Sequence, residues 1–195
     1  MRIVLASKNA HKLEEIRELL QIPGVEFVGL DAWPDMPEVV EDADTFEGNG
    51  VKKAVETAAF TGEWCLADDS GLEVDALGGA PGVYSARYAG VHGDDDANNL
   101  KVLADMEGQS ERTARFVCAL ALSNPQGEHR VLRGTVEGTI DQACSGSNGF
   151  GYDVLFIPEG HEQTFGVLDP SIKAGMSHRA NACRAAAVAW SEWLA

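Results

Sequence analysis

Short apolar runs alternate with amphipathic stretches along the first part of the chain. Ile3–Ala6 is continuously apolar, as a buried strand is, and leucine and isoleucine then recur at helical spacing from His11 to Leu20. Helical spacing returns in 51–60, and Trp64–Ala67 is a second short apolar run. Strands that alternate with helices predict an α/β fold.

The later part of the chain adds period-two patterns. Leu72–Ala76 alternates apolar and acidic residues, which predicts a strand with one exposed face. Residues 114–122 and 129–139 alternate on either side of the turn at 124–127 and predict an antiparallel hairpin. The remaining expectations are a helix that starts near 94, a loop over 164–177, and a last helix capped by Ser177.

Composition and charge mainly exclude certain classes of protein and partner. The chain has 195 residues, 45% of them hydrophobic and 24% charged, which suits one globular domain or two small lobes. Its formal net charge of −16 disfavours nucleic acid and anionic lipid as partners. No apolar run approaches the ~20 residues of a spanning helix, and no signal peptide is expected. Four cysteines without a CxxC motif fit a reducing cytoplasm.

A polar turn follows the first apolar run. It comprises Ser7-Lys8-Asn9-Ala10-His11-Lys12 and ends in the predicted helix, with Asn9 as the candidate N-cap. Free backbone N–H groups and the dipole of a helix start bind anions, and Lys8 and Lys12 add positive charge. Taken alone, the segment is better explained as a capped helix with two solvated lysines. It is not a Walker-type loop.

Two adjacent carboxylates, Asp68 and Asp69, end the run Trp64–Ala67, and Ser70-Gly71 is expected to break that strand. Open α/β sheets place their chemistry at the carboxyl ends of strands. Because neighbouring strand residues face opposite ways, at most one carboxylate points into a pocket unless the chain bends. An isolated acidic pair is more often a surface turn, but the long context here argues otherwise.

That context is LADDSGLEVDALGGAPGVYSARYAG at 66–90, which closely resembles the signature of the inosine/xanthosine triphosphate pyrophosphatase family. SKNAHK at 7–12, GFGYD at 149–153 and SHR at 177–179 are similar to three further motifs of that family, in the expected order. The resemblance implies hydrolysis of non-canonical purine nucleoside triphosphates. It also implies an elongated mixed β-sheet flanked by helices, one domain of two lobes with a central cleft, and a homodimer.

The resemblance further implies cleavage between the α- and β-phosphates with Mg²⁺, which Glu41 would share with Asp69. Carboxylates suit Mg²⁺, which prefers oxygen ligands and retains several waters. Asp69 is the candidate general base, acting directly or through metal-bound water. The sequence leaves open whether Asp68 or Glu38 also contacts the metal. The candidate phosphate-binding residues are Ser7, Lys8, Asn9, Ala10, His11, Lys12 and Ser70.

One motif departs from the family pattern. Where members commonly carry Phe-x-Glu-Asn-Ala, this chain has Phe46-Glu47-Gly48-Asn49-Gly50. The acid at the third place is missing, so its role is not assigned to Glu47. Lys52 or Lys53 in the following helix is expected to face the phosphates, and the sequence does not choose between them.

The glycine- and serine-rich loop at 144–151 leads to two aromatics and an acid. Phe150 or Tyr152 can stack on a flat base and Asp153 can hydrogen-bond to it, although such aromatics are more often core. A 6-oxo purine accepts a hydrogen bond where adenine donates one, and Arg179 offers only donors. The candidate base-contacting residues are Phe150, Gly151, Tyr152, Asp153, Lys173, His178 and Arg179.

Two charge arguments complete the site. His178 and Arg179 are expected in the first turn of the last helix, where their positive charge opposes the dipole and a bound nucleotide would compensate it. A basic pocket on an acidic body is also expected.

The alternative functions are a pyrophosphatase for modified or pyrimidine nucleotides and a nucleotide-binding module without turnover. An aspartyl-phosphate phosphatase is disfavoured, because it needs Asp-x-Asp and these acids are adjacent.

Overall fold

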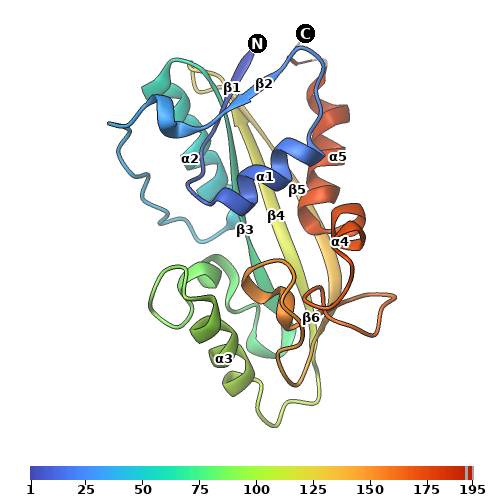
Figure 1. Ribbon diagram of the computed structural model, residues 1–195. Helices are drawn as coiled ribbons and strands as arrows, with labels where there is room; N and C mark the ends of the chain where they lie inside the picture. Colours follow the sequence, from blue (N-terminus) through green and yellow to red (C-terminus); the bar gives the residue numbers. More distant parts are fainter. Residues whose placement is uncertain (192, 195) are drawn as a thin grey trace. The chain divides into compact units, whose positions relative to one another are not determined.

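The computed structural model describes residues 1–191 and 193–194, which contain one six-stranded sheet in the order β2-β1-β3-β4-β5-β6 (Figure 1). β1 is parallel to both β2 and β3, whereas β6 is antiparallel to β5, so the sheet is mixed. The expected mixed sheet flanked by helices is confirmed. The strands are β1 Arg2–Leu5, β2 Glu26–Val28, β3 Trp64–Val74, β4 Thr113–Ser123, β5 His129–Ile140 and β6 Phe156–Pro158.

The helices largely follow the apolar periodicity. α2 begins earlier than predicted, because Thr45 accepts the Gly48 N–H at 3.0 Å and caps it. The predicted loop over 164–177 is wrong in part, because Asp169 caps a short helix that has Pro170 at its start. The helices are α1 Ala10–Leu19, α2 Phe46–Thr61, α3 Asp95–Asp105, α4 Pro170–Met176 and α5 His178–Ser191. The 3₁₀ segments are η1 Leu30–Ala32, η2 Asp75–Leu77, η3 Gly82–Arg87 and η4 Gly151–Val154.

The predicted strand break at Ser70-Gly71 is wrong, since β3 continues to Val74. Gly71 serves close packing rather than a turn. A Cβ added at Gly71 would lie 2.3 Å from Ser85 Oγ, and that hydroxyl accepts the Leu72 N–H at 2.9 Å. The glycine therefore lets the segment that contains Ser85 lie directly against the strand.

The chain divides into two compact units. Unit 1 comprises Met1–Asp69, Cys118–Gly134 and Arg179–Ala195, and its core includes residues of β1, α1 and α5. Unit 2 comprises Ser70–Val117 and Thr135–His178, and its core includes residues of α3, β4 and β6. The cleft between two lobes stays a prediction. Among the described residues, no helix combines the length and apolarity needed to span a membrane.

Candidate functional site

The first predicted motif of unit 1 forms a capped helix start between β1 and α1. Asn9 Oδ1 accepts the Lys12 N–H at 3.2 Å, and Ser7 Oγ accepts the Asn9 N–H at 3.1 Å. The predicted N-cap is therefore confirmed. Lys8, Ala10 and His11 are exposed at this end of α1. A helix start of this kind can bind an anion, and the phosphate-binding role of these residues stays a prediction.

Asp68 is a fully buried carboxylate at the centre of an ion-pair network. Its Oδ1 lies 2.6 Å from Lys12 Nζ and its Oδ2 lies 2.9 Å from Arg179 Nε. Burial acts to raise the pKa of Asp68, but Arg179 and Lys12 outweigh it and hold the pKa well below its usual value. Arg179 also pairs with Glu15. Asp68 therefore stays ionised and ties α1 and α5 to β3.

Asp69 has different partners from its neighbour, as adjacent residues of a strand should. Its Oδ1 accepts a hydrogen bond from Lys53 Nζ at 2.9 Å, and the same ammonium lies 3.2 Å from Glu41 Oε1. Lys52 instead pairs with the exposed Asp42 at 2.6 Å. Lys53 is therefore the lysine that contacts the Asp69 and Glu41 carboxylates, and which of the two lysines faces the phosphates stays a prediction.

The Asp69 carboxylate is only partly satisfied. Its Oδ2 is buried and has no hydrogen-bond partner among the described residues. Burial raises the pKa of Asp69 above its usual value, although the Lys53 ammonium acts to lower it. A buried oxygen without a partner indicates that a water, an ion or a substrate group belongs beside it.

The donor set fits a divalent cation that is shared with a substrate. Glu41 and Asp69 contact the same ammonium, so both carboxylates reach one place. Among the described residues, no group of three or more His, Cys, Asp or Glu side chains could hold a metal. Mg²⁺ is usually held by one or two carboxylates together with substrate phosphates, and two carboxylates meet that need.

The expected basic pocket is not found in this network. The ion pairs join three cations to four carboxylates: Lys12, Lys53 and Arg179 with Glu15, Glu41, Asp68 and Asp69. Buried cations are costly unless they are paired, so the fold surrounds them with carboxylates. The cluster therefore carries one negative charge more than it carries positive charges.

The charge argument for the last helix is corrected in the same way. The guanidinium of Arg179 is 1% exposed, and Asp68 and Glu15 supply its counter-ions, so no bound nucleotide is required for that purpose. In unit 2 the His178 ring is buried and stacks on Phe116 with centroids 4.9 Å apart. Contact of His178 or Arg179 with a base stays a prediction.

The predicted base motif forms a tightly bonded loop within unit 2. Asp153 Oδ2 accepts the Phe150 N–H at 2.9 Å and lies 2.6 Å from Lys173 Nζ. That ammonium lies 4.5 Å from the centroid of the Phe150 ring. Tyr152 is buried, and its hydroxyl donates to the Ser85 carbonyl at 2.7 Å. Of the two aromatic candidates, Phe150 is the half-exposed one, whereas Tyr152 belongs to the core.

Asn49 is a residue that the sequence analysis named but gave no role. It is fully buried in the first turn of α2, and its Oδ1 accepts the Ala43 N–H at 2.9 Å. This bond fastens the acidic loop that carries Glu41 to the helix that carries Lys53. The available signal was an amide at the start of a helix, beside a long polar loop.

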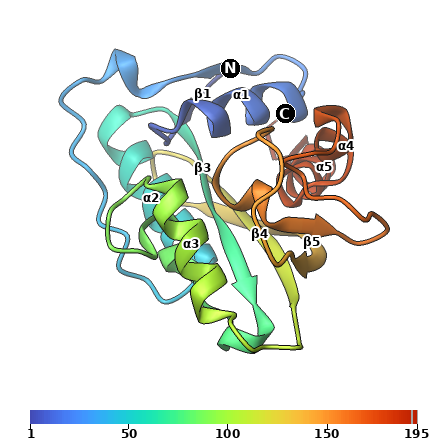
Figure 2. The same cartoon turned by 60° about the horizontal axis from the view of Figure 1, so that its bottom comes forward.

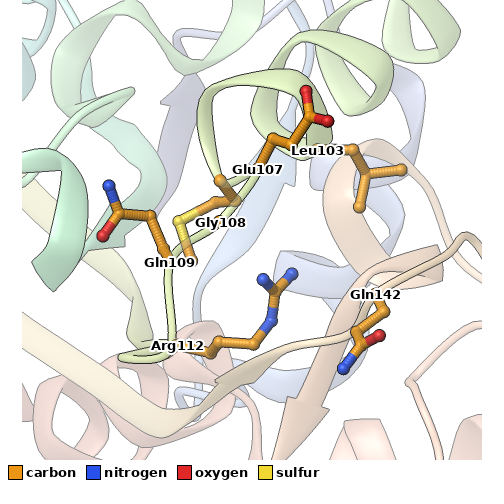
Figure 3. A pocket seen from close by; sticks show the side chains of 7 residues that line it. Leu103, Glu107, Gly108, Gln109, Arg112 and Gln142 are labelled. Carbon is orange, nitrogen blue, oxygen red and sulfur yellow. The ribbon is translucent and has the colours of Figure 1, made fainter.

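A separate hollow of about 330 Å³ lies in unit 2 (Figure 3). The guanidinium of Arg112, which extends beside it, donates to the carbonyls of Ile140 and Asp141 at 2.6 Å each. None of the predicted site residues lines it. The lining residues are Leu103, Met106, Glu107, Gly108, Gln109, Arg112 and Gln142.

The protein has an α/β fold, and in its candidate site two carboxylates contact one lysine beside the acidic part of a strand. Residues 3–189 match the model of the Ham1 family, and the chain belongs to that family. It is 50% identical over 184 residues to a dITP/XTP pyrophosphatase of Exiguobacterium sp., covering 94% of each chain. It is 50% identical over 188 residues to a dITP/XTP pyrophosphatase of Desulforamulus reducens, covering 95% of this chain and 94% of the other.

Solved structures agree with this assignment. A HAM1 protein from Coxiella burnetii is 39% identical, with a TM-score of 0.91 over 98% of this chain and 99% of that chain. The Ham1 protein of Staphylococcus aureus is 38% identical, with a TM-score of 0.88 over 96% and 97% of the two chains. The resemblance that the sequence motifs indicate is therefore confirmed.

Proposed function

We propose that this protein hydrolyses non-canonical purine nucleoside triphosphates (ITP, dITP and XTP) to the monophosphate and pyrophosphate. The observation that carries the proposal is the Lys53 ammonium between Asp69 and Glu41, at 2.9 and 3.2 Å, beside a buried carboxylate oxygen that has no hydrogen-bond partner in the described part of the chain. Support also comes from relatives that are named dITP/XTP pyrophosphatase and are 50% identical over nearly the whole chain.

Asp69 acts as the general base in this proposal. Burial raises the pKa of Asp69, which makes its carboxylate a stronger proton acceptor than an exposed aspartate. Oδ2 is the atom that takes the proton of the attacking water, because Oδ1 is held by Lys53. Asp69 and Glu41 would hold Mg²⁺, which would supply charge neutralisation at the phosphates when bound.

The lysines and the capped helix start bind the triphosphate. Lys53 and Lys12 donate to phosphate oxygens, together with Ser7, Lys8, Asn9 and the N–H groups at the start of α1. Ser70 follows Asp69 directly and donates a further hydrogen bond. Asp68 holds Lys12 in place through the 2.6 Å ion pair.

In this proposal the site recognises a 6-oxo purine by the hydrogen-bond acceptor that the base carries. Lys173 and the half-exposed ring of Phe150 lie together, with the ammonium 4.5 Å from the ring centroid. The cation donates to the purine oxygen and the ring stacks on the base. A site built around such donors discriminates against adenine, whose amino group also donates.

A homodimer in the cytoplasm completes the proposal. All four cysteines are free, which suits a reducing compartment. Sedimentation velocity at several concentrations tests the dimer, and a single species with the mass of one chain would contradict it.

The direct test is a product assay. Purified protein is mixed with Mg²⁺ and either dITP or dATP, and both pyrophosphate and orthophosphate are measured. We expect pyrophosphate from dITP and little turnover of dATP. Equal turnover of the two substrates would contradict the base specificity, and release of orthophosphate would contradict the bond assignment. Absence of turnover would favour a binding module instead.

A further inference from the structure

Two side chains near the start of α3 form hydrogen bonds with both backbone polar groups of Gly151, in the base motif. Asp95 Oδ2 accepts the Gly151 N–H at 2.8 Å, and Asn99 Nδ2 donates to the Gly151 carbonyl at 2.9 Å. The two side chains are one turn apart on the same helix face. α3 packs against η4, which begins at Gly151, and Figures 1 and 2 show α3 beside an orange segment of the ribbon.

General helix chemistry accounts for only part of the bonding of this pair. Acidic residues at a helix start complement the dipole, but the cap itself is Asp94, which accepts the Ala97 N–H at 3.0 Å. Asn99 is 3% exposed, and asparagine is a poor residue for a helix interior. Burying an amide is costly unless it is hydrogen-bonded, and Asn99 Nδ2 donates both to the Asp95 carbonyl one turn back, at 2.8 Å, and to the Gly151 carbonyl.

The helix start that carries the pair is itself fixed within unit 2. Asn98 Oδ1 accepts the Ala89 N–H at 2.7 Å, which joins α3 to the segment that follows η3. Gly151 has a φ of +61°, a conformation that glycine adopts without strain. With its N–H and C=O both bonded, the peptide planes on either side of Gly151 have one favoured orientation.

Those peptide planes lead directly to the base-contacting groups. Phe150 precedes Gly151, and Asp153 accepts the Phe150 N–H at 2.9 Å while it pairs with Lys173 at 2.6 Å. A rotation of the loop at Gly151 would therefore move both the ring and the cation that the proposed function assigns to the base.

We propose that Asp95 and Asn99 are positioning residues that set the base specificity of this site by fixing Gly151. The inference rests on the proposed hydrolysis of non-canonical purine nucleotides. It assigns no contact between α3 and the substrate: the two side chains act only through the orientation of Phe150 and Lys173.

The test compares substrates that differ in the base alone. The variants Asp95→Ala and Asn99→Ala are assayed for kcat/KM with dITP and with dATP, alongside thermal unfolding. We expect kcat/KM for dITP to fall by about tenfold, the loss that follows from one hydrogen bond, while that for dATP changes little. Asp95→Asn keeps an acceptor for the Gly151 N–H and should restore most of the ratio. Asp96→Ala, on the exposed neighbouring residue, is the matched control.

The outcomes separate the inference from the function on which it rests. A wild-type protein that does not release pyrophosphate from dITP overturns the proposed function. Binding of inosine monophosphate, measured by calorimetry, then tests the positioning role by itself. Parallel losses for dITP and dATP, or an unchanged ratio in both alanine variants, would show that Asp95 and Asn99 only stabilise the fold.

Discussion

Lys53 Nζ lies 2.9 Å from Asp69 Oδ1, in contact with the carboxylate to which we assign the chemistry. Burial acts to lower the pKa of Lys53, but the Asp69 and Glu41 carboxylates outweigh it and raise that pKa above its usual value. The ammonium is therefore charged at neutral pH. It orients Asp69 before a substrate arrives and is placed to donate to a phosphate oxygen.

Replacing Lys53 by methionine removes this charge while it keeps most of the side-chain volume. We expect kcat/KM with dITP to fall by about 100-fold, the usual effect of losing one preorganised donor to a developing charge. Lys52→Met is the matched control, because Lys52 pairs with the exposed Asp42 and should leave the rate nearly unchanged. Steady-state kinetics with dITP measure kcat/KM for both variants, and similar values would remove Lys53 from the site.

The sequence predicted what depends on local pattern and missed what depends on distant partners. The helix start at Asn9 and the apolar runs of β1 and β3 follow from neighbouring residues, so periodicity and capping preferences were sufficient. The counter-ion of Arg179 lies 111 positions away at Asp68. No spacing rule within one segment connects such a pair, so a ligand was wrongly expected to balance the guanidinium.

Gly71 shows the same limit of predictions from local sequence. At Gly71 the sequence predicted a strand break, because glycine commonly marks a turn. The structure shows an uninterrupted strand in which a Cβ at that position would lie 2.3 Å from Ser85 Oγ. Close approach and turning use the same residue type, and only the tertiary partner distinguishes them.

Replacing Asp68 by asparagine should destabilise the protein strongly. The variant leaves Arg179 buried with one counter-ion fewer, and breaking a buried pair in this way costs about 3–5 kcal/mol. The urea midpoint should fall by about 1 M or more at the m-values of small proteins. Asp42→Asn breaks the exposed pair with Lys52 and should leave the midpoint unchanged. Equal midpoints for the two variants would mean that the buried network contributes nothing to stability.

Replacing Glu41 should raise the Mg²⁺ concentration that the reaction needs. We expect chelation to abolish activity and added Mg²⁺ to restore it, because the negatively charged triphosphate and the carboxylates repel each other unless a cation lies between them. Glu41→Gln should raise the Mg²⁺ concentration for half-maximal rate by at least about tenfold. Glu38→Gln, in the same acidic loop on an exposed residue, should not alter it. Full activity in the presence of excess chelator would rule out the proposed metal.

Two glycines of the base motif should respond differently to the same methyl group. Gly149 and Gly151 have φ angles of +74° and +61°, so alanine is strained at both by about 1–2 kcal/mol. A Cβ at Gly149 would also lie 2.0 Å from Asp153 Oδ2, whereas one at Gly151 would meet open space within the described part of the chain. Gly149→Ala must therefore displace the carboxylate that holds Lys173 and the Phe150 N–H. Thermal unfolding should show a clearly larger loss for Gly149→Ala, and equal losses would mean that Asp153 does not order the loop.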